Sequence, residues 1–249
     1  MSEEWLFYPC QMGDHRASIF YDHGIHDTIN QTAPPHLLKV RVAFKTPRPD
    51  GLSSQEEFER LCALEDGLEA VVKKHGGIYV GRITAAGHRY FHIFTADTDD
   101  MWSADLVALG NEHGYPLQFA LKSDESKDGY WRDLFPSDDD WQVIMDLWLL
   151  EALDKQGDDG ATSRRIEHWA YFPLSAGAEQ FAQWARDQQY DVEGTEPSDD
   201  GKHCVRFSHN GTCQLSEITA HTVALRRKAS ELGGDYDGWE TPVCKPQSS

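Results

Sequence analysis

The chain has 249 residues, of which 39% are hydrophobic and eight are Trp, so it can fold around a core and is not an intrinsically disordered protein. Its formal net charge of −19 would repel a phosphate backbone and attract a basic protein surface, which argues against direct nucleic-acid binding. No apolar run reaches the roughly 20 residues that span a bilayer, the N-terminus lacks the basic start of a signal peptide, and the five cysteines include no close pair. We therefore expect a cytoplasmic protein with no membrane contact.

Residues 1–122 predict an alternation of strands and helices. Residues 16–22 and 37–45 alternate apolar with polar side chains, a period of two that is typical of half-buried strands. A helix follows over 53–77, with Ser and Glu in capping-box spacing at its start and a glycine at its end. Two strands joined by a short turn, a second helix and a closing strand over 116–121 complete a β-α-β-β-α-β order, preceded by one extra strand.

The same order of elements returns in residues 163–249. A strand in RIEHWAYF precedes a helix, two strands around the turn SDDG, a second helix capped by Ser216 and a last strand over 236–243. GGIYVG at 76–81 and GGDYDG at 233–238 both follow a helix and enter a strand. Because a glycine cap followed by a strand-forming Tyr is common, this echo is only weak support for a duplication.

Residues 123–162 form an acidic connector, with twelve Asp and Glu against three Lys and Arg. A capped helix over 137–155 has apolar side chains around nearly its whole circumference, which predicts burial on two sides, either between the two parts or against a second copy of the chain. A homodimer through this helix is therefore one expectation. The glycine-containing residues 157–163 indicate a flexible hinge.

Together these patterns predict an α+β fold of two tandem ferredoxin-like (β-α-β-β-α-β) sandwiches, at residues 1–122 and 163–249, joined by the acidic connector and its apolar helix. In each sandwich, helices lie on one face of an antiparallel sheet.

Residues with catalytic or metal-binding chemistry are scattered, and the sequence contains no nucleophile elbow, phosphate loop, dinucleotide fingerprint or paired-cysteine metal spacing. In the loop DHGIHD a helical turn would bring together four possible metal ligands: His23, His26, Asp22 and Asp27. A second set spans a strand and a turn and would have to converge on folding: His203, Cys204, His209 and Cys213. A plain polar loop and an ordinary strand explain both sets, so we expect no metal and no cofactor.

The aromatic strands HRYFHIF (88–94) and IEHWAYF (166–172) are similar in composition to the stacking platforms of RNA-binding ferredoxin-like domains. Such platforms need surrounding Lys and Arg, whereas this chain has a large negative net charge. We therefore interpret the aromatics as core residues. The basic cluster at 226–228 lies on a predicted helix and is interpreted as a solvated face.

Two families resemble parts of the chain. Residues 163–249 resemble the bacterial family typified by the regulator of ribonuclease E activity B (RraB), through RRIEHWAYFP, AEQFAQWARDQQYDV and SEITAHTVALRRKASELGGDYDGWETPV. Residues 1–122 resemble a bacterial domain of unknown function (DUF695), through LLKVRVAFKTPRPDGLSSQEEFERLCALEDGL and YVGRITAAGHRYFHIFTAD. The first resemblance implies an acidic, cytoplasmic, ferredoxin-like protein that binds the basic scaffold region of ribonuclease E and changes RNA turnover.

The stretch LGGDYDGWETPV, residues 232–243, predicts an edge strand, where a proline is tolerated because one side lacks a ladder partner. Tyr and Trp between acids are also typical of protein-binding surfaces, so a structural strand and a binding strand are both open interpretations. The candidate partner-binding residues lie on this strand and at the acidic start of the connector helix: Tyr236, Asp237, Trp239, Glu240, Asp138, Asp139 and Asp140.

The expected function is non-enzymatic binding of a protein with a basic surface, and the resemblance implies ribonuclease E as that partner. Two alternatives stay open. A metal-dependent enzyme would use the loop from His23 to Asp27, and a structural module would assemble through the connector helix.

Overall fold

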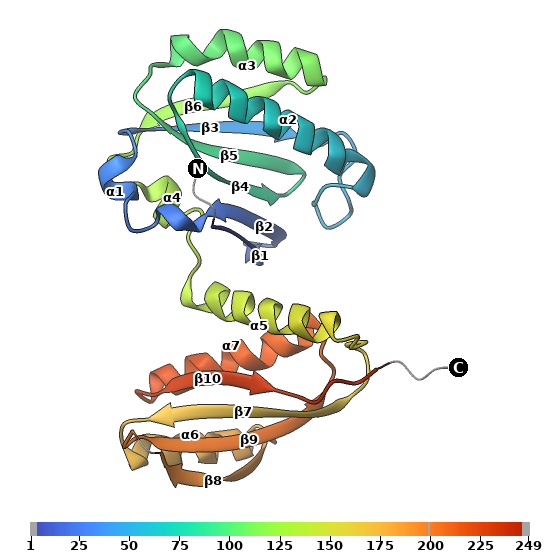
Figure 1. The fold of residues 1–249 in the computed structure, drawn as a ribbon, viewed down its shortest axis with the longest axis vertical. Helices are drawn as coiled ribbons and strands as arrows, with labels where there is room; N and C mark the ends of the chain where they lie inside the picture. Colours follow the sequence, from blue (N-terminus) through green and yellow to red (C-terminus); the bar gives the residue numbers. More distant parts are fainter. Residues whose placement is uncertain (1–3, 199, 246–249) are drawn as a thin grey trace. The chain divides into compact units, whose positions relative to one another are not determined.

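The computed structural model describes residues 4–198 and 200–245, apart from the side chains of residues 99 and 100 (Figure 1). The chain divides into two compact units, residues 1–136 and 137–249, and each has its own sheet and its own core. Both sheets are antiparallel, and the described residues form seven α-helices, which confirms the predicted α+β class.

The first unit contains a six-stranded sheet in the order β1-β2-β4-β5-β3-β6. Its elements are β1 (Trp5–Met12), β2 (His15–Asp22), α1 (Ile29–Thr32), β3 (His36–Ala43), α2 (Gln55–Lys74), β4 (Ile78–Ala85), β5 (His88–Thr95), α3 (Asp99–His113), β6 (Leu117–Ser123) and α4 (Asp128–Trp131). From β3 to β6 they follow the predicted β-α-β-β-α-β order. Two strands precede that order where the sequence predicted one, because β1 pairs with β2 and the hairpin extends the sheet beyond β4.

The core of the first unit lies between its sheet and helices α2 and α3. The period of two in β3 predicted the inward side chains correctly, since Leu38, Val40, Val42 and Phe44 all belong to this core. On the reverse face, the chain after β6 folds back over the sheet, and the Tyr130 hydroxyl donates to the Asp22 carbonyl at 2.8 Å. This return segment covers part of the face that the helices leave free.

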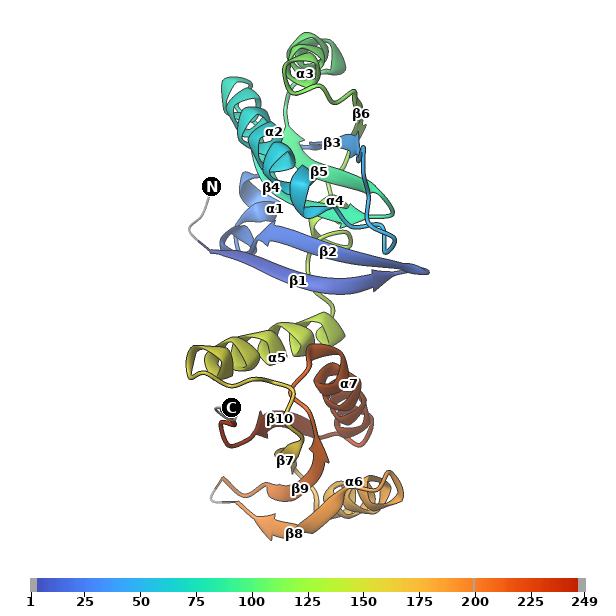
Figure 2. The same cartoon turned by 90° about the vertical axis from the view of Figure 1, so that its right-hand side faces the viewer.

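The second unit begins with α5 (Asp138–Lys155), whose N-cap Ser137 forms a capping box with Asp140. The following elements are β7 (Arg164–Phe172), α6 (Ser175–Asp187), β8 (Asp191–Pro197), β9 (His203–Gly211), α7 (Leu215–Glu231) and β10 (Asp235–Glu240). Their sheet has the order β10-β7-β9-β8, and α6 and α7 lie on the same side of it (Figure 2). From β7 to β10 the elements follow the β-α-β-β-α-β order of a ferredoxin-like sandwich.

Helix α5 packs against α7 inside the second unit. The Asp146 carboxylate is 1% exposed and accepts hydrogen bonds from Thr222 of α7 at 2.5 Å and from the indole Nε1 of Trp239 in β10 at 2.9 Å. Met145 and Trp148 of the same helix are 43% and 50% exposed. Contact of the connector helix with a second copy of the chain therefore stays a prediction.

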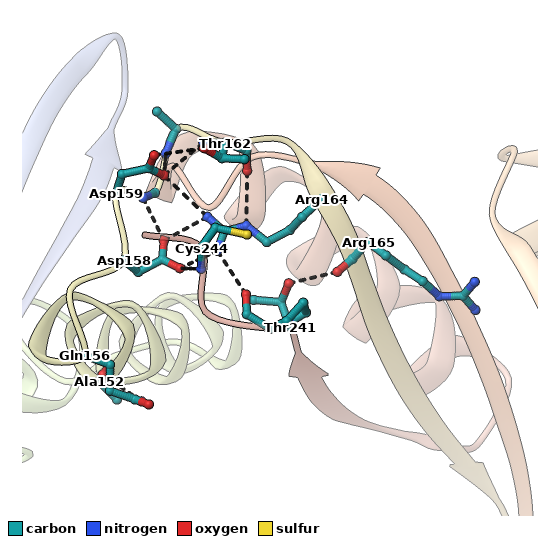
Figure 3. Close-up of polar contacts among 12 residues, drawn as sticks. Ala152, Gln156, Asp158, Asp159, Thr162, Arg164, Arg165, Thr241 and Cys244 are labelled. Carbon is teal, nitrogen blue, oxygen red and sulfur yellow. Dashed lines mark hydrogen bonds and ion pairs between the residues drawn. The ribbon is translucent and has the colours of Figure 1, made fainter. Parts of the chain in front are cut away.

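The segment after α5, residues 157–163, is tied to the end of the chain (Figure 3). Both terminal nitrogens of Arg164 pair with the Asp158 carboxylate, and Nη1 also donates to the Pro242 carbonyl at 3.0 Å. The same carboxylate accepts a hydrogen bond from the backbone N–H of Cys244 at 2.7 Å, and its pairing with Arg164 lowers its pKa to about 2. The segment that the glycines predicted to be a flexible hinge is therefore held by hydrogen bonds, because its aspartates accept them from Arg164 and Cys244.

The glycine–tyrosine echo in the sequence corresponds to a repeated piece of backbone. In both copies the first glycine follows a helix with a positive φ, 63° at Gly76 and 74° at Gly233. The strand that follows is bulged between the tyrosine and the last glycine, which again has a positive φ, 148° at Gly81 and 133° at Gly238. The echo thus has a structural basis: a left-handed helix end, a buried tyrosine and a bulge.

Candidate protein-binding surface

Within the second unit, α6 and α7 cover one side of the sheet, and none of its described helices covers the other side. Along β7, the buried residues Ile166, His168, Ala170 and Phe172 alternate with residues that point the other way. We call this outward side of the sheet the open face. Its charged and aromatic residues, with one cysteine, are Arg165, Glu167, Trp169 and Tyr171 of β7; Asp191, Glu193 and Glu196 of β8; Cys204 and Arg206 of β9; and Asp235, Asp237 and Glu240 of β10.

Two aromatic side chains lie half-buried in the middle of the open face, Trp169 and Tyr171. The guanidinium of Arg206 lies over the Trp169 ring, 5.6 Å from its centroid. On the opposite flank, the residue paired with Trp169 is Gly238 of β10, and a Cβ placed there would meet no atom within 4 Å. Arg206 therefore occupies one flank of the indole, and the residue paired on the other flank has no side chain.

Acidic residues outnumber arginines on the open face by seven to two. Arg206 donates to Glu167 at 2.6 Å and lies 3.1 Å from Glu193, and this pairing lowers the pKa of Glu167 below its usual value. Arg165 also pairs with both glutamates, so the arginines neutralise the β7–β9 side of the face.

The β10 side of the open face keeps its negative charge. Within the described part of the chain, no ion pair involves Asp235, Asp237 or Glu240. The negative charge also affects the neighbouring thiol of Cys204. Burial raises the pKa of this thiol, a hydrogen bond with Tyr171 lowers it, and the charge of Asp237 raises it further. Because a protonated thiol is a poor nucleophile, Cys204 does not suggest covalent chemistry.

The structure divides the predicted residues of β10 between two faces. Asp237 and Glu240 are exposed on the open face. Tyr236 and Trp239 are 8% and 7% exposed, and their polar ends lie against His168 at 2.7 Å and Asp146 at 2.9 Å inside the unit. Direct contact between these two aromatics and a partner stays a prediction. β10 itself ends at Glu240, before the proline that the edge-strand prediction included.

The three predicted aspartates of α5 have separate roles. Asp139 pairs with both arginines at 226–227 of α7, and these contacts lower its pKa. Asp140 completes the capping box at the start of the helix. Asp138 also lies 3.5 Å from Arg226, and it lines a groove of about 340 Å³ together with Asp235. The basic cluster of α7 is thus partly used to fasten α5, rather than being only a solvated face.

The candidate metal loop brings its two histidines together by stacking. The rings of His23 and His26 are 4.6 Å apart and nearly parallel. His26 Nε2 lies 3.1 Å from Asp27, whereas His23 Nδ1 lies 3.1 Å from the Tyr21 hydroxyl and the neighbouring Asp22 is buried. Within residues 4–198 and 200–245, no group of three or more His, Cys, Asp or Glu is arranged to hold a metal ion.

The second set of possible ligands is split by the sheet. Cys204 is on the open face, His209 points toward the helices, and Cys213 packs in an apolar cluster with Leu153 and Ile166. His203 is the first residue of β9, next to Cys204 but on the opposite side of the pleat. These four residues therefore do not converge.

His209 instead belongs to a stack of three histidines behind the open face. His168 Nε2 lies 2.9 Å from His209 Nδ1, and the His209 ring stacks on His221 with centroids 3.9 Å apart. Tyr190 closes the other end, with its hydroxyl 2.5 Å from His221 Nδ1. Burial lowers the pKa of all three histidines, to about 2 for His168 and about 4 for His209. The stack is therefore neutral at pH 7 and joins β7, β9 and α7.

Sequence reasoning compared the aromatics of IEHWAYF with a stacking platform and interpreted them as core residues. That interpretation holds for Phe172, which lies in the core, but not for Trp169 and Tyr171, which are half-buried on the open face. The strict alternation in RIEHWAYF carried the missing signal, since a period of two places these rings opposite Phe172.

A model of the family of unknown function DUF695 matches residues 3–135, more than half of the chain. The chain belongs to the DUF695 family. A second model, "Regulator of ribonuclease activity B" (RraB), matches residues 144–241 and covers all four strands of the open face. Both resemblances expected from the sequence are confirmed. This DUF695 protein therefore carries a region of a regulatory family.

The other comparisons add little. No curated protein matches this DUF695 protein. Among solved structures, it is similar to an unknown protein from Galdieria sulphuraria, with 12% identity, a TM-score of 0.23, and coverage of 84% of this chain and 99% of that chain. It is also similar to a "putative glycine cleavage system transcriptional repressor", with 12% identity, a TM-score of 0.25, and coverage of 84% and 98%. Likenesses this low support no argument. None of the described helices is long and apolar enough to cross a membrane.

Proposed function

We propose that this DUF695 protein is a non-enzymatic, cytoplasmic regulator that binds a protein partner through its second unit, and that the partner is ribonuclease E. The RraB match over residues 144–241 is the observation that carries this proposal. The acidic open face supports it, because a negatively charged surface attracts a basic segment and speeds its approach. We place the contact on the basic scaffold region of ribonuclease E, with a change in RNA turnover as the consequence.

Binding and activity measurements with purified proteins test this function. The full-length chain should bind the scaffold region of ribonuclease E in calorimetry, and the affinity should fall as salt shortens the Debye length from about 10 Å at 0.1 M to about 3 Å at 1 M. Added to intact ribonuclease E, the chain should change the rate at which a substrate RNA is cleaved.

An enzyme truncated before its scaffold region is the matched control, and its cleavage rate should not respond to the chain. Absence of a complex at both salt concentrations, or an equal effect on the truncated enzyme, would refute the proposal.

A further inference from the structure

We infer that the open face binds an extended, arginine-rich peptide segment, with one guanidinium stacked on Trp169 and paired with the carboxylates of β10. The inference rests on the proposed function, because it names the surface that meets the basic partner and the side chains that the partner supplies.

The geometry around Trp169 favours a second guanidinium. Residues paired across the strands form a row on the open face, from Gly238 through Trp169 and Arg206 to Gly194. Arg206 already lies over the indole, which demonstrates that the ring accepts a guanidinium in this setting. A Cβ at Gly238 or Gly194 would meet no atom within 4 Å, so both ends of the row are uncrowded.

The free flank of Trp169 faces the carboxylates that have no cation. Asp235 is paired across the ladder with Tyr171, and Glu240 with Glu167, so acids of β10 stand on both sides of the Gly238 position. Asp237 is exposed in the bulge between them. A guanidinium on this flank would contact the indole face and two or more carboxylates at once, and charge-assisted hydrogen bonds of this kind are the stronger ones.

Arginine suits this surface better than lysine or a nucleotide. A planar guanidinium stacks on an aromatic ring and binds carboxylates in a bidentate manner, whereas an ammonium group acts as a point charge. The open face carries seven acidic residues and only two arginines, so it would repel phosphates. Trp169 and Tyr171 are two residues apart, about 7 Å along the strand. Arginines at alternate positions of an extended peptide have the same spacing and would meet both rings.

Fluorescence anisotropy with the full-length protein tests the inference. The probe is a labelled ten-residue peptide that alternates Arg with Ser, compared with peptides carrying Lys or Glu in place of Arg. We expect the Arg peptide to bind, the Lys peptide to bind several-fold more weakly, and the Glu peptide not to bind. Trp169→Ala should weaken binding of the Arg peptide about tenfold, and Trp169→Phe, which keeps an aromatic face, should lose less.

Charge is tested separately from stacking. The combined substitution Asp235→Asn, Asp237→Asn and Glu240→Gln should also weaken binding and should flatten its dependence on salt. The matched controls are residues outside the open face: Phe7→Ala removes an aromatic side chain that is 54% exposed, and Glu151→Gln with Asp154→Asn removes exposed acids of α5. These controls should leave the affinity unchanged, and urea midpoints should report that each variant is folded.

Three results would overturn the inference: equal affinity of Trp169→Ala and the unsubstituted protein, equal loss in Phe7→Ala, or tighter binding of a single-stranded RNA of ten nucleotides than of the Arg peptide. The proposed function fails separately. If ribonuclease E binds but Trp169→Ala does not change its affinity, the inferred binding surface is wrong and the proposed function is still supported. If the peptide binds at Trp169 but ribonuclease E does not bind, the surface is right and the partner is wrong.

Discussion

Arg164 is a buried cation whose partners come from two parts of the second unit, the segment after α5 and the end of the chain. Its side chain is 4% exposed, that of Asp158 is 2% exposed, and the pair holds the segment after α5 against the carbonyl of Pro242. Burying such a pair gains little net stability, but removing one member leaves an uncompensated charge in the interior. The stability of the unit should therefore depend strongly on this one side chain.

We predict that Arg164→Ala lowers the free energy of unfolding of the second unit by about 3–5 kcal/mol, because it leaves the Asp158 carboxylate buried and unpaired. Arg164→Lys should lose less, since an ammonium keeps the charge but not the two-pronged geometry. Urea denaturation provides the measurement. The adjacent Arg165, 45% exposed, is the control, and its replacement by Ala should change stability by less than about 0.5 kcal/mol. Similar losses at the two positions would contradict the assignment.

At the scale of elements, the histidine stack makes the contact of β7, β9 and α7 sensitive to pH. Burial depresses the pKa of His168, His209 and His221 in the folded protein below the ordinary value of 6.5. Between pH 6.5 and about 4, the unfolded chain therefore binds protons that the folded chain does not. Stability conferred by the neutral stack is complete above pH 6.5 and is lost as the pH falls.

We predict that the free energy of unfolding decreases between pH 6.5 and 4.5, with each histidine adding a slope of up to about 1.4 kcal/mol per pH unit. His209→Gln should reduce that slope by the share of one histidine, although the variant itself should be less stable at pH 7. Urea midpoints measured at half-unit intervals would provide the slopes. Equal slopes in the variant and the unsubstituted protein would exclude His209 as a contributor.

Much of this element structure could be predicted from the sequence, because period and punctuation are local properties. The alternation in β3, the capping of α2 and α5 and the turn between β4 and β5 depend on residues a few positions apart. Contacts made by distant residues could not be predicted. The Asp158–Arg164 pair binds the backbone near the end of the chain. The sequence of β7 shows that the strand has two faces, but it does not show which face α6 and α7 cover. Trp169 and Tyr171 were assigned to the core because the face of β7 that stays uncovered could not be predicted.

At the scale of the whole molecule, α5 belongs structurally to the RraB region rather than to a free connector. It buries Ile144 and Leu153, and its Asp146 carboxylate receives the indole N–H of Trp239. A second unit without α5 would expose apolar surface and leave that N–H without its acceptor, which is destabilising.

We predict that residues 137–249 fold alone, with a cooperative urea transition, whereas residues 163–249 are at least several kcal/mol less stable or aggregate, because the surface under α5 is then exposed. Circular dichroism and analytical ultracentrifugation of the two fragments make the comparison. Equal stability of the fragments would indicate that α5 contributes nothing to this unit.

Assembly is a second property of the whole chain. Met145 and Trp148 on α5 are large apolar side chains with 43% and 50% exposure, and we propose that a second copy covers them. Trp148→Asp should then convert a dimer to a monomer in size-exclusion chromatography with light scattering, while the circular dichroism spectrum stays the same. A mass that is identical before and after the substitution would rule out a dimer through this helix.

The bulge at Gly238 determines which residues of β10 the protein hides and which it displays. In a regular strand, Tyr236 and Trp239 would face opposite sides, since they are three positions apart. The extra residue lets both rings point inward and leaves Asp237 and Glu240 outside. Deleting Asp237 would remove the bulge but leave both rings pointing inward, because they would then be two positions apart in a regular strand. Natural relatives should therefore separate the two rings either by two residues with a bulge or by one residue without it.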